Sequence, residues 1–294
     1  MQTTISSSVT IGENSANPLI AHRPGYGTMR LTGEGIYGEP ANRPEAIQIL
    51  KKAVDMGVNY IDTADYYGPG VTNRLIAEAL FPYDKDLIIG TKVGAIRKED
   101  KSWNIFAKPE QLRQSVENNL KELKQEQLSL VHFRVMHTND TSFEESLGAM
   151  FEMQKEGMIL HVGLSNVSRE QLQSGMKMGA IASVQNLYGY NQRTTLAGPM
   201  GGQGGEEILD LLEENHIPLI PYFSLQTSLG NGQDKIDKIA QKYNLSPAQM
   251  NICWLLHKSP LILPIPGTTS LIHLAENLKA AEVKLSDDDM EYLG

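Results

Sequence analysis

Three residues in one stretch of the sequence have complementary chemistry. Asp62 and Tyr67 lie in YIDTADYYG and Lys92 lies in IIGTKVG, so a carboxylate, a phenol and an ammonium group follow two successive strand-like runs. A free tyrosine has a pKa near ~10 and a free lysine near ~10.4. A cationic lysine beside the phenol favours phenolate, and a carboxylate fixes the lysine and keeps it charged. The trio is therefore suited to a tyrosine that donates a proton near neutral pH.

Each of these residues also has an ordinary structural interpretation. An aspartate at a strand end often caps the following turn, a tyrosine there often packs, and a lysine there is usually solvated. A shared catalytic role requires an architecture that brings all three side chains to one place. The order of elements along the chain therefore decides between the two interpretations.

Composition predicts an ordinary globular protein. The 294 residues are 40% hydrophobic and 21% charged, and no apolar run reaches the roughly 18 residues of a membrane span. The N-terminus has no basic region followed by an apolar core, so we expect a cytoplasmic protein. A formal charge of -9 argues against general binding to nucleic acid or anionic membranes. The single Cys253 excludes an internal disulfide, and no cluster with metal-ligand spacing is present.

Short apolar runs alternate with amphipathic helical patterns after a lead-in of 23 residues. We expect strands at 26–29, 59–62, 87–92, 128–134, 159–165, 182–186, 217–222 and 261–266. We expect helices at 44–56, 72–80, 109–123, 143–156, 169–178, 206–214, 233–243, 247–257 and 271–281. This alternation indicates parallel strands, and eight units in one chain without a linker predict a single-domain (β/α)8 barrel over residues 1–294. A doubly wound open sheet would show a GxGxxG loop opening a helix, and GYGTMR is instead followed by a long loop.

The chemistry of such a barrel lies at the carboxyl ends of its strands. Here those positions are Gly27, Thr28, Met29, Asp62, Lys92, Arg134, Ser165, Asn166, Gln185, Tyr222, Gly267, Thr268 and Thr269. Turns need some polar residues in any protein, but polar side chains at nearly every strand end are better explained by a mouth that holds a ligand.

Six motifs carry a resemblance over essentially the full length. The chain resembles an aldo-keto reductase through GYGTM, YIDTADYYG, IIGTKVG, HVGLSN, VQNLY and LPIPGTTSLIHLAEN, which occur in the expected order. The resemblance implies a barrel that binds an extended nicotinamide cofactor and passes a hydride to a small aldehyde or ketone. It also implies that Asp62, Tyr67 and Lys92 are three members of the family's catalytic tetrad, with Tyr67 as the acid.

The fourth catalytic position departs from the family pattern. The family usually places a histidine at the end of the fourth strand, and alignment of LSLVHFRVMH puts Arg134 there. His132 shares a strand face with Arg134, and we expect it to be a hydrogen-bonded interior residue. His137 is expected in the following loop, where it could line the pocket. A salt bridge between Arg134 and a rim carboxylate such as Asp65 is the alternative to a role in the site.

An arginine at this position bears on the substrate. Guanidinium stays charged and can polarise an oxygen, but it cannot alternate as acid and base. Arg134, NYIDTADYYGPGVTN and IPGTTSLIHL resemble the pyridoxal reductase branch of the family. Pyridoxal carries a phenolic oxygen beside its aldehyde, so we expect reduction of pyridoxal to pyridoxine. A general aldehyde or quinone reductase and a non-catalytic NADPH-binding regulatory barrel are the alternatives.

The resemblance also implies a set of cofactor-binding residues. Ser165, Asn166 and Gln185 would bind the nicotinamide amide, and Tyr188, in preference to Tyr222, would stack on the ring. The remaining expected cofactor contacts are Gly27, Thr28, Met29, Ser224, Leu225, Pro266, Gly267, Thr268, Thr269, His273, Glu276 and Asn277. His273 stands where many relatives have an arginine for the 2′-phosphate, so NADPH is favoured and NADH is not excluded. Residues 198–207 could form a lid or an ordinary surface loop, and residues 224–232 are expected to cover the pyrophosphate.

Overall fold

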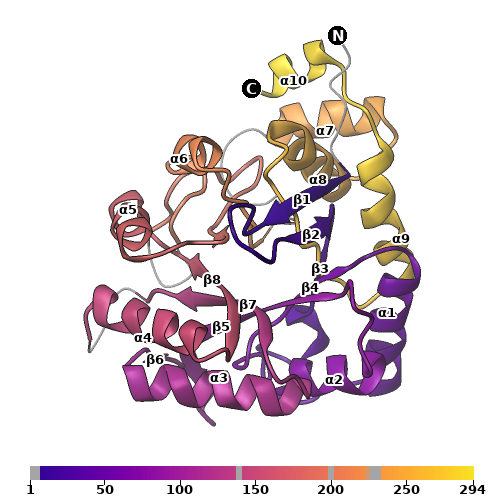
Figure 1. The fold of residues 1–294 in the computed structure, drawn as a ribbon. Coiled ribbons are helices and arrows are strands. Elements are labelled where there is room, and N and C mark those ends of the chain that lie inside the picture. The colour runs from indigo at the N-terminus through magenta and orange to yellow at the C-terminus, as the bar shows by residue number, and fades with distance from the viewer. Residues whose placement is uncertain (1–6, 137–140, 198–201, 224, 226–232) are drawn as a thin grey trace.

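The computed structural model describes residues 7–136, 141–197, 202–223, 225 and 233–294. Its centre is a run of parallel strands paired in the order β3, β4, β5, β7, β8 and β9 (Figure 1). These strands are β3 (Tyr26–Gly27), β4 (Tyr60–Asp62), β5 (Ile88–Arg97), β7 (Leu128–Arg134), β8 (Ile159–Ser165) and β9 (Val184–Gln185).

Two further segments close this sheet into a barrel. Leu219 bridges Val184 on one side and Ile262 on the other, both in parallel. The segment containing Ile262 then returns to the first strand, because Gly25 N donates to Pro264 O at 2.9 Å and Gly27 N donates to Pro266 O at 3.3 Å. The predicted (β/α)8 barrel is confirmed.

The last two barrel segments are less regular than predicted. The expected strands at 217–222 and 261–266 pair through isolated bridges and single hydrogen bonds. Prolines occupy positions 218, 221, 264 and 266. Proline has no N–H group to donate, so each one removes a rung from the hydrogen-bond ladder.

Helices follow the strands and cover the outside of the barrel (Figure 1). They are α1 (Arg43–Asp55), α2 (Val71–Leu80), α3 (Pro109–Leu123), α4 (Phe143–Lys155), α5 (Arg169–Met178), α6 (Leu209–Glu214), α7 (Gln233–Lys242), α8 (Pro247–Lys258) and α9 (Leu271–Lys279), with short 3-10 turns η1 (Met29–Leu31) and η2 (Ala280–Glu282). Ser168 and Ser246 cap their helices in capping boxes completed by Gln171 and Gln249. Within the described residues, no helix is long and apolar enough to cross a membrane.

Four elements, β1 (Ser8–Ile11), β2 (Leu19–His22), β6 (Trp103–Phe106) and α10 (Asp287–Leu293), were not predicted from the sequence. The lead-in contains β1 and β2 as an antiparallel hairpin. Strand β5 continues past Lys92 and folds back on β6, and the chain ends in helix α10. Each is short and depends on contacts with the barrel, so local periodicity gives only a weak signal.

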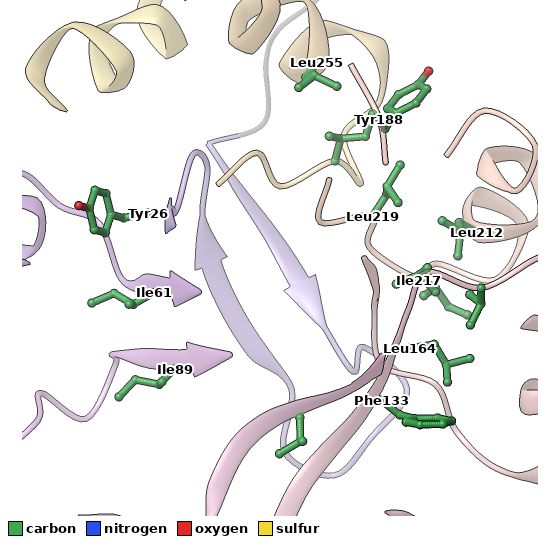
Figure 2. Close-up of a cluster of buried hydrophobic side chains, with 14 of the residues drawn as sticks. Tyr26, Ile61, Ile89, Phe133, Leu164, Tyr188, Leu212, Ile217, Leu219 and Leu255 are labelled. Carbon is green, nitrogen blue, oxygen red and sulfur yellow. The ribbon is translucent and has the colours of Figure 1, made fainter. Parts of the chain in front are cut away.

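Alternation along the strands separates two hydrophobic clusters. Ile61, Ile89 and Phe133 point outward toward the helices (Figure 2). Tyr60, Ile88 and Leu130 point inward and form a second cluster with Val9, Ile11 and Ala21 of the β1–β2 hairpin. The hairpin therefore closes the amino-terminal end of the barrel with apolar side chains. Polar side chains are left for the opposite end.

Candidate active site

Asp62 and Lys92 form a buried ion pair at the carboxyl end of the barrel. Asp62 ends β4, and Lys92 lies in the neighbouring β5, two residues beyond the partner of Asp62. The Lys92 ammonium donates to Asp62 Oδ1 at 2.8 Å and to Oδ2 at 2.7 Å. It also donates to the Thr63 carbonyl at 2.6 Å. The pair fixes the ammonium group in one orientation.

Tyr67 joins this pair from the loop between β4 and α2. The Lys92 nitrogen lies 4.9 Å from the centre of the Tyr67 ring, and Tyr67 is buried. The ring of Tyr66 packs edge-on against Tyr67, with 5.4 Å between their centres. The structure thus brings the predicted carboxylate, phenol and ammonium into one cluster.

The expected lowering of the Tyr67 pKa is wrong for this structure. Burial raises the pKa of Tyr67 well above its usual value, Asp62 and Tyr66 raise it further, and Arg134 lowers it only in part. Tyr67 is a neutral phenol near pH 7, which is the protonation state that a proton donor requires.

Arg134 lies at the end of β7, within reach of the same cluster. Its guanidinium carbon is 5.4 Å from the centre of the Tyr222 ring. Burial opposes the charge, but the phenols of Tyr66, Tyr222 and Tyr67 outweigh this effect and the pKa of Arg134 stays above its usual value. Among the described residues Arg134 makes no ion pair with Asp65, so the predicted alternative of a structural salt bridge is absent there.

His132 lies inside the barrel below the mouth, as predicted. Its Nε2 is 2.9 Å from Ser183 Oγ, and the side chain is completely buried. Burial, followed by the nearby Lys92 charge, lowers the pKa of His132 to about 3, so the ring is neutral at physiological pH. His137 lies outside the described residues.

Two buried polar atoms at the mouth have no partner among the described residues. They are Ser165 Oγ and Gln185 Oε1. The other end of the Gln185 amide donates to Asp62 Oδ1 at 2.8 Å, which fixes the orientation of this side chain. Buried groups of this kind normally find a hydrogen-bond partner, so both atoms are suited to a ligand.

Asn166, by contrast, is hydrogen-bonded within the protein through both its amide nitrogen and its amide oxygen. Its Nδ2 donates to Val135 O at 2.8 Å, and its Oδ1 accepts from Gln203 N at 2.9 Å and from the Tyr222 hydroxyl at 3.2 Å. Asn166 therefore holds Tyr222 and the 202–204 segment in place. The Gln203 contact was not predicted, and nothing in the sequence signals it.

The predicted preference for Tyr188 over Tyr222 is wrong. Tyr188 is completely buried, its hydroxyl donates to Glu206, and its ring lies 5.6 Å from that of Trp254. Figure 2 shows it in the hydrophobic cluster together with Leu219. Tyr222 instead contacts Arg134 and Asn166. It is the tyrosine of the two that the structure places at the mouth.

The last barrel segment and the start of α9 lie beside the first strand. The Tyr26 hydroxyl donates to Thr268 O at 2.7 Å, and Thr28 Oγ1 donates to Asp62 O at 2.9 Å. Ser270 caps α9 by accepting from His273 N at 3.4 Å. This region also contains the other expected cofactor contacts: Gly27, Met29, Pro266, Gly267, Thr269, Glu276 and Asn277.

Three predictions concern loops that are described only in part. Ser224 and residues 226–232 lie outside the described residues, and Leu225 packs beside Ile252 and Leu256 of α8. Residues 198–201 of the expected lid also lie outside them. Gly204 bridges Leu187, two residues after β9, and Gly202 bridges Leu196 at the other end of the same loop.

Comparison with known proteins agrees with this geometry. The family model described as "Aldo/keto reductase family" matches residues 25–294. The chain belongs to the aldo/keto reductase family. It is 39% identical over 293 residues to pyridoxine 4-dehydrogenase from Escherichia coli (strain K12), which covers 98% of this chain and 97% of that protein. It is also 35% identical over 280 residues to uncharacterized oxidoreductase C215.11c of Schizosaccharomyces pombe, covering 94% of this chain and 87% of that one.

Solved structures of the family share the fold. A thermostable aldo-keto reductase, Tm1743, in complex with the inhibitor epalrestat superposes with a TM-score of 0.80 at 28% identity, covering 97% of this chain and 98% of that one. An aldo/keto reductase from Klebsiella pneumoniae in complex with NADP and acetate gives a TM-score of 0.76 at 22% identity, covering 98% and 94%. This aldo/keto reductase is therefore an oxidoreductase built on the family's barrel.

Proposed function

We propose that this aldo/keto reductase uses NADPH to reduce pyridoxal to pyridoxine. The observation that carries the proposal is Arg134, a permanent cation beside Tyr67 at the position where the family pattern has histidine. The similarity to the pyridoxine 4-dehydrogenase of E. coli, whose name describes the same alcohol and aldehyde pair, supports it.

The residues at the mouth fit a nicotinamide cofactor. A carboxamide carries one acceptor oxygen and two N–H donors. Ser165 Oγ can donate to the oxygen, and Gln185 Oε1 can accept from the amide nitrogen. Tyr222 offers an aromatic face near these two groups, and Thr268, Ser270 and the amino-terminal end of α9 provide donors suited to phosphate. When bound, the cofactor supplies the hydride.

Tyr67 supplies the proton in this proposal. As hydride reaches the carbonyl carbon, negative charge builds on the oxygen, and a neutral phenol in hydrogen-bonding range transfers its proton there. Lys92 then stabilises the phenolate that forms, because its ammonium is held beside the ring. Burial lowers the pKa of Lys92, and Asp62 opposes this effect and favours the charged ammonium.

Arg134 selects the substrate in this proposal. A planar guanidinium binds two neighbouring oxygen atoms better than one. The phenolic oxygen of pyridoxal lies beside its aldehyde, so one arginine can contact both. A simple aromatic aldehyde lacks the second oxygen and gains less from the cation.

The test is steady-state oxidation of NADPH and NADH with pyridoxal, benzaldehyde and a quinone. We expect the native enzyme to give its highest kcat/KM with pyridoxal and NADPH. We expect Arg134→Met to lower kcat/KM for pyridoxal by a factor roughly tenfold to a hundredfold larger than the factor for benzaldehyde. Arg113→Met, which removes an exposed arginine on α3, is the control. It should leave kcat/KM unchanged for both pyridoxal and benzaldehyde.

Each contrary outcome points to a different function. Equal use of benzaldehyde and pyridoxal by the native enzyme would leave a general aldehyde reductase, and faster use of the quinone would leave a quinone reductase. Binding of NADPH without turnover on any of the three compounds would leave a regulatory barrel. An unchanged preference in Arg134→Met would show that the arginine does not select the substrate.

A further inference from the structure

A cavity lies at the end of the barrel opposite Tyr67. Its volume is about 290 Å³, and it is bounded by the turn of the β1–β2 hairpin, the end of α5 and the segments that lead into β8, β9 and Leu219. His161 on β8 lines it, four residues before Ser165. At roughly 3.3 Å per residue, the cavity is about 13 Å from the mouth along that strand.

His161 presents a hydrogen-bond acceptor to this cavity. Its Nε2 lies 2.7 Å from Asn17 O, and because a carbonyl can only accept, Nε2 carries the proton. Burial lowers the pKa of His161, which keeps the ring neutral. Nδ1 is therefore a lone-pair acceptor, and it has no hydrogen-bond partner among the described residues. The ring is only 4% exposed, so the acceptor is held on a fixed side chain.

The hairpin turn is shaped around this histidine. Gly12 has a φ of +67°, and a Cβ atom there would lie 2.6 Å from His161 Cε1. Both the backbone conformation and the available space favour glycine at this position. The turn and the ring are therefore packed as one wall of the cavity.

Two neighbouring amides also offer acceptors. Gln154 Nε2 donates to Leu160 O at 2.8 Å, and Asn215 Nδ2 donates to Leu211 O at 2.8 Å. Each amide thus donates one N–H to a backbone carbonyl, and its oxygen has no hydrogen-bond partner among the described residues. At the rim, the Glu13 carboxylate lies 3.6 Å from His216 Nδ1. These groups place several acceptors around the cavity, beside apolar walls that include Met176 and Ile181.

We propose that this cavity is a second ligand site, separate from the active site, that binds a small organic ammonium ion with an apolar body. An ammonium group provides several donors and a positive charge, which match the acceptors of His161, Gln154 and Asn215 and the Glu13 carboxylate. Since a water molecule occupies about 30 Å³ of liquid, the cavity has room for roughly ten non-hydrogen atoms. The apolar body would lie against Met176 and Ile181.

Calorimetric titration of the full-length protein with phenethylamine and with phenethyl alcohol, both with NADPH present, tests the proposal. We expect saturable binding of the amine and at least roughly tenfold weaker binding of the alcohol, which has the same shape but no charge. Equal affinity for the two compounds, or no saturable amine binding up to about 10 mM, would overturn it.

Two histidine variants test whether the amine binds in this cavity. His161→Phe keeps a ring in place but removes the acceptor, and it should weaken amine binding roughly tenfold. His22→Phe is the matched control, since it also removes a histidine contact to a backbone carbonyl, at Gly57 O, without reaching the cavity. Unchanged binding in His161→Phe, or an equal loss in His22→Phe, would contradict the assignment.

Another variant covers the case in which His161→Phe does not fold, because His161 also anchors the hairpin. Ala180→Leu adds bulk at an exposed position in the cavity lining and leaves the hairpin contact intact. It should lose amine binding while keeping a native circular dichroism spectrum. Full binding by folded Ala180→Leu would show that the amine does not occupy this cavity.

Discussion

Tyr67 acquires its chemistry from residues that other elements supply. Lys92 comes from β5, Arg134 from β7, and Tyr66 is its neighbour in the loop. Burial, with Asp62 and Tyr66, raises the pKa of Tyr67 and favours the protonated phenol. In the proposed mechanism, Lys92 and Arg134 stabilise the phenolate that forms after proton transfer. The proton is therefore available at neutral pH without a lowered pKa in this structure.

Removal of the Tyr67 hydroxyl should abolish most of the activity. We expect Tyr67→Phe to lower kcat by about 10²- to 10⁴-fold, the usual contribution of a positioned acid, while NADPH affinity changes little. Stopped-flow turnover and fluorescence titration of NADPH measure the two effects. Retention of near-native kcat would assign the proton donor to another group.

Asp65 should make the stability of the folded protein depend on pH. Burial raises the pKa of Asp65 from 3.8 to about 8, even though Ser115 hydrogen-bonds the carboxyl, and Oδ1 has no partner among the described residues. The folded protein thus retains a proton that the unfolded chain loses above pH 3.8. Stability from this group is complete below that pH and declines as the pH rises toward 8.

Asp65→Asn should remove this decline. Because the side chain is partly accessible, we expect a modest gain of about 1 to 2 kcal/mol at pH 8 and little difference near pH 4. Urea unfolding at several pH values measures it. Asp55→Asn, which removes the same charge from an exposed site on α1, is the control and should show no such trend.

Buried or half-buried polar side chains attach several elements to their neighbours. Helix α10 is attached through Asp289, which accepts from the Lys242 ammonium at 2.7 Å and from the Tyr243 hydroxyl at 2.5 Å. Behind the active site, Asn119 of α3 accepts from Asn73 of α2 and from Thr91 of β5, which ties two helices to the strand that carries Lys92. Both contacts join residues far apart in sequence.

Asp289→Asn tests the attachment of α10. Burial alone would raise the pKa of Asp289, but the contacts with Lys242, Ser286 and Tyr243 lower it to about 2. Its stabilisation is present above pH 3.8 and is lost as the pH falls toward 2. Lys242 is 56% exposed, so after solvent screening we expect a cost of about 1 kcal/mol at pH 7. Thermal unfolding measures it, and the exposed Asp288→Asn in the same helix turn should cost less.

For the whole molecule, closure of the barrel and formation of the active site depend on one seam. Gly25 and Gly27 of the first barrel strand pair with Pro264 and Pro266 of the last segment. The Tyr26 hydroxyl crosses the same seam to Thr268 O and sets the start of α9 beside the mouth. A change that opens the seam should therefore affect both stability and cofactor binding.

Gly27→Ala probes that seam. A Cβ atom at this position would lie 2.7 Å from Ile265 O, so the strands must separate. We expect a loss of about 1 to 3 kcal/mol in the free energy of unfolding, together with weaker NADPH binding. Gly148→Ala in α4 is the control, because no atom lies within 4 Å of the added carbon, and it should be neutral or stabilising. Equal effects of the two changes would show that the seam tolerates the added carbon.

The sequence by itself determined the parts of this protein that local rules govern. Periodicity gives α3, β7, β8 and α5 with the bounds that the structure has, because each is a regular run ended by clear signals. Strand alternation put His132 on the same face as Arg134, and the position of Arg134 at the end of its strand put it at the mouth. Only the tertiary structure decided the direction of the Tyr67 pKa shift and the position of Tyr222, in place of Tyr188, at the mouth. It alone also revealed the β1–β2 hairpin and the cavity beside His161. Each of these depends on burial by residues distant in the chain, and no local pattern encodes that environment.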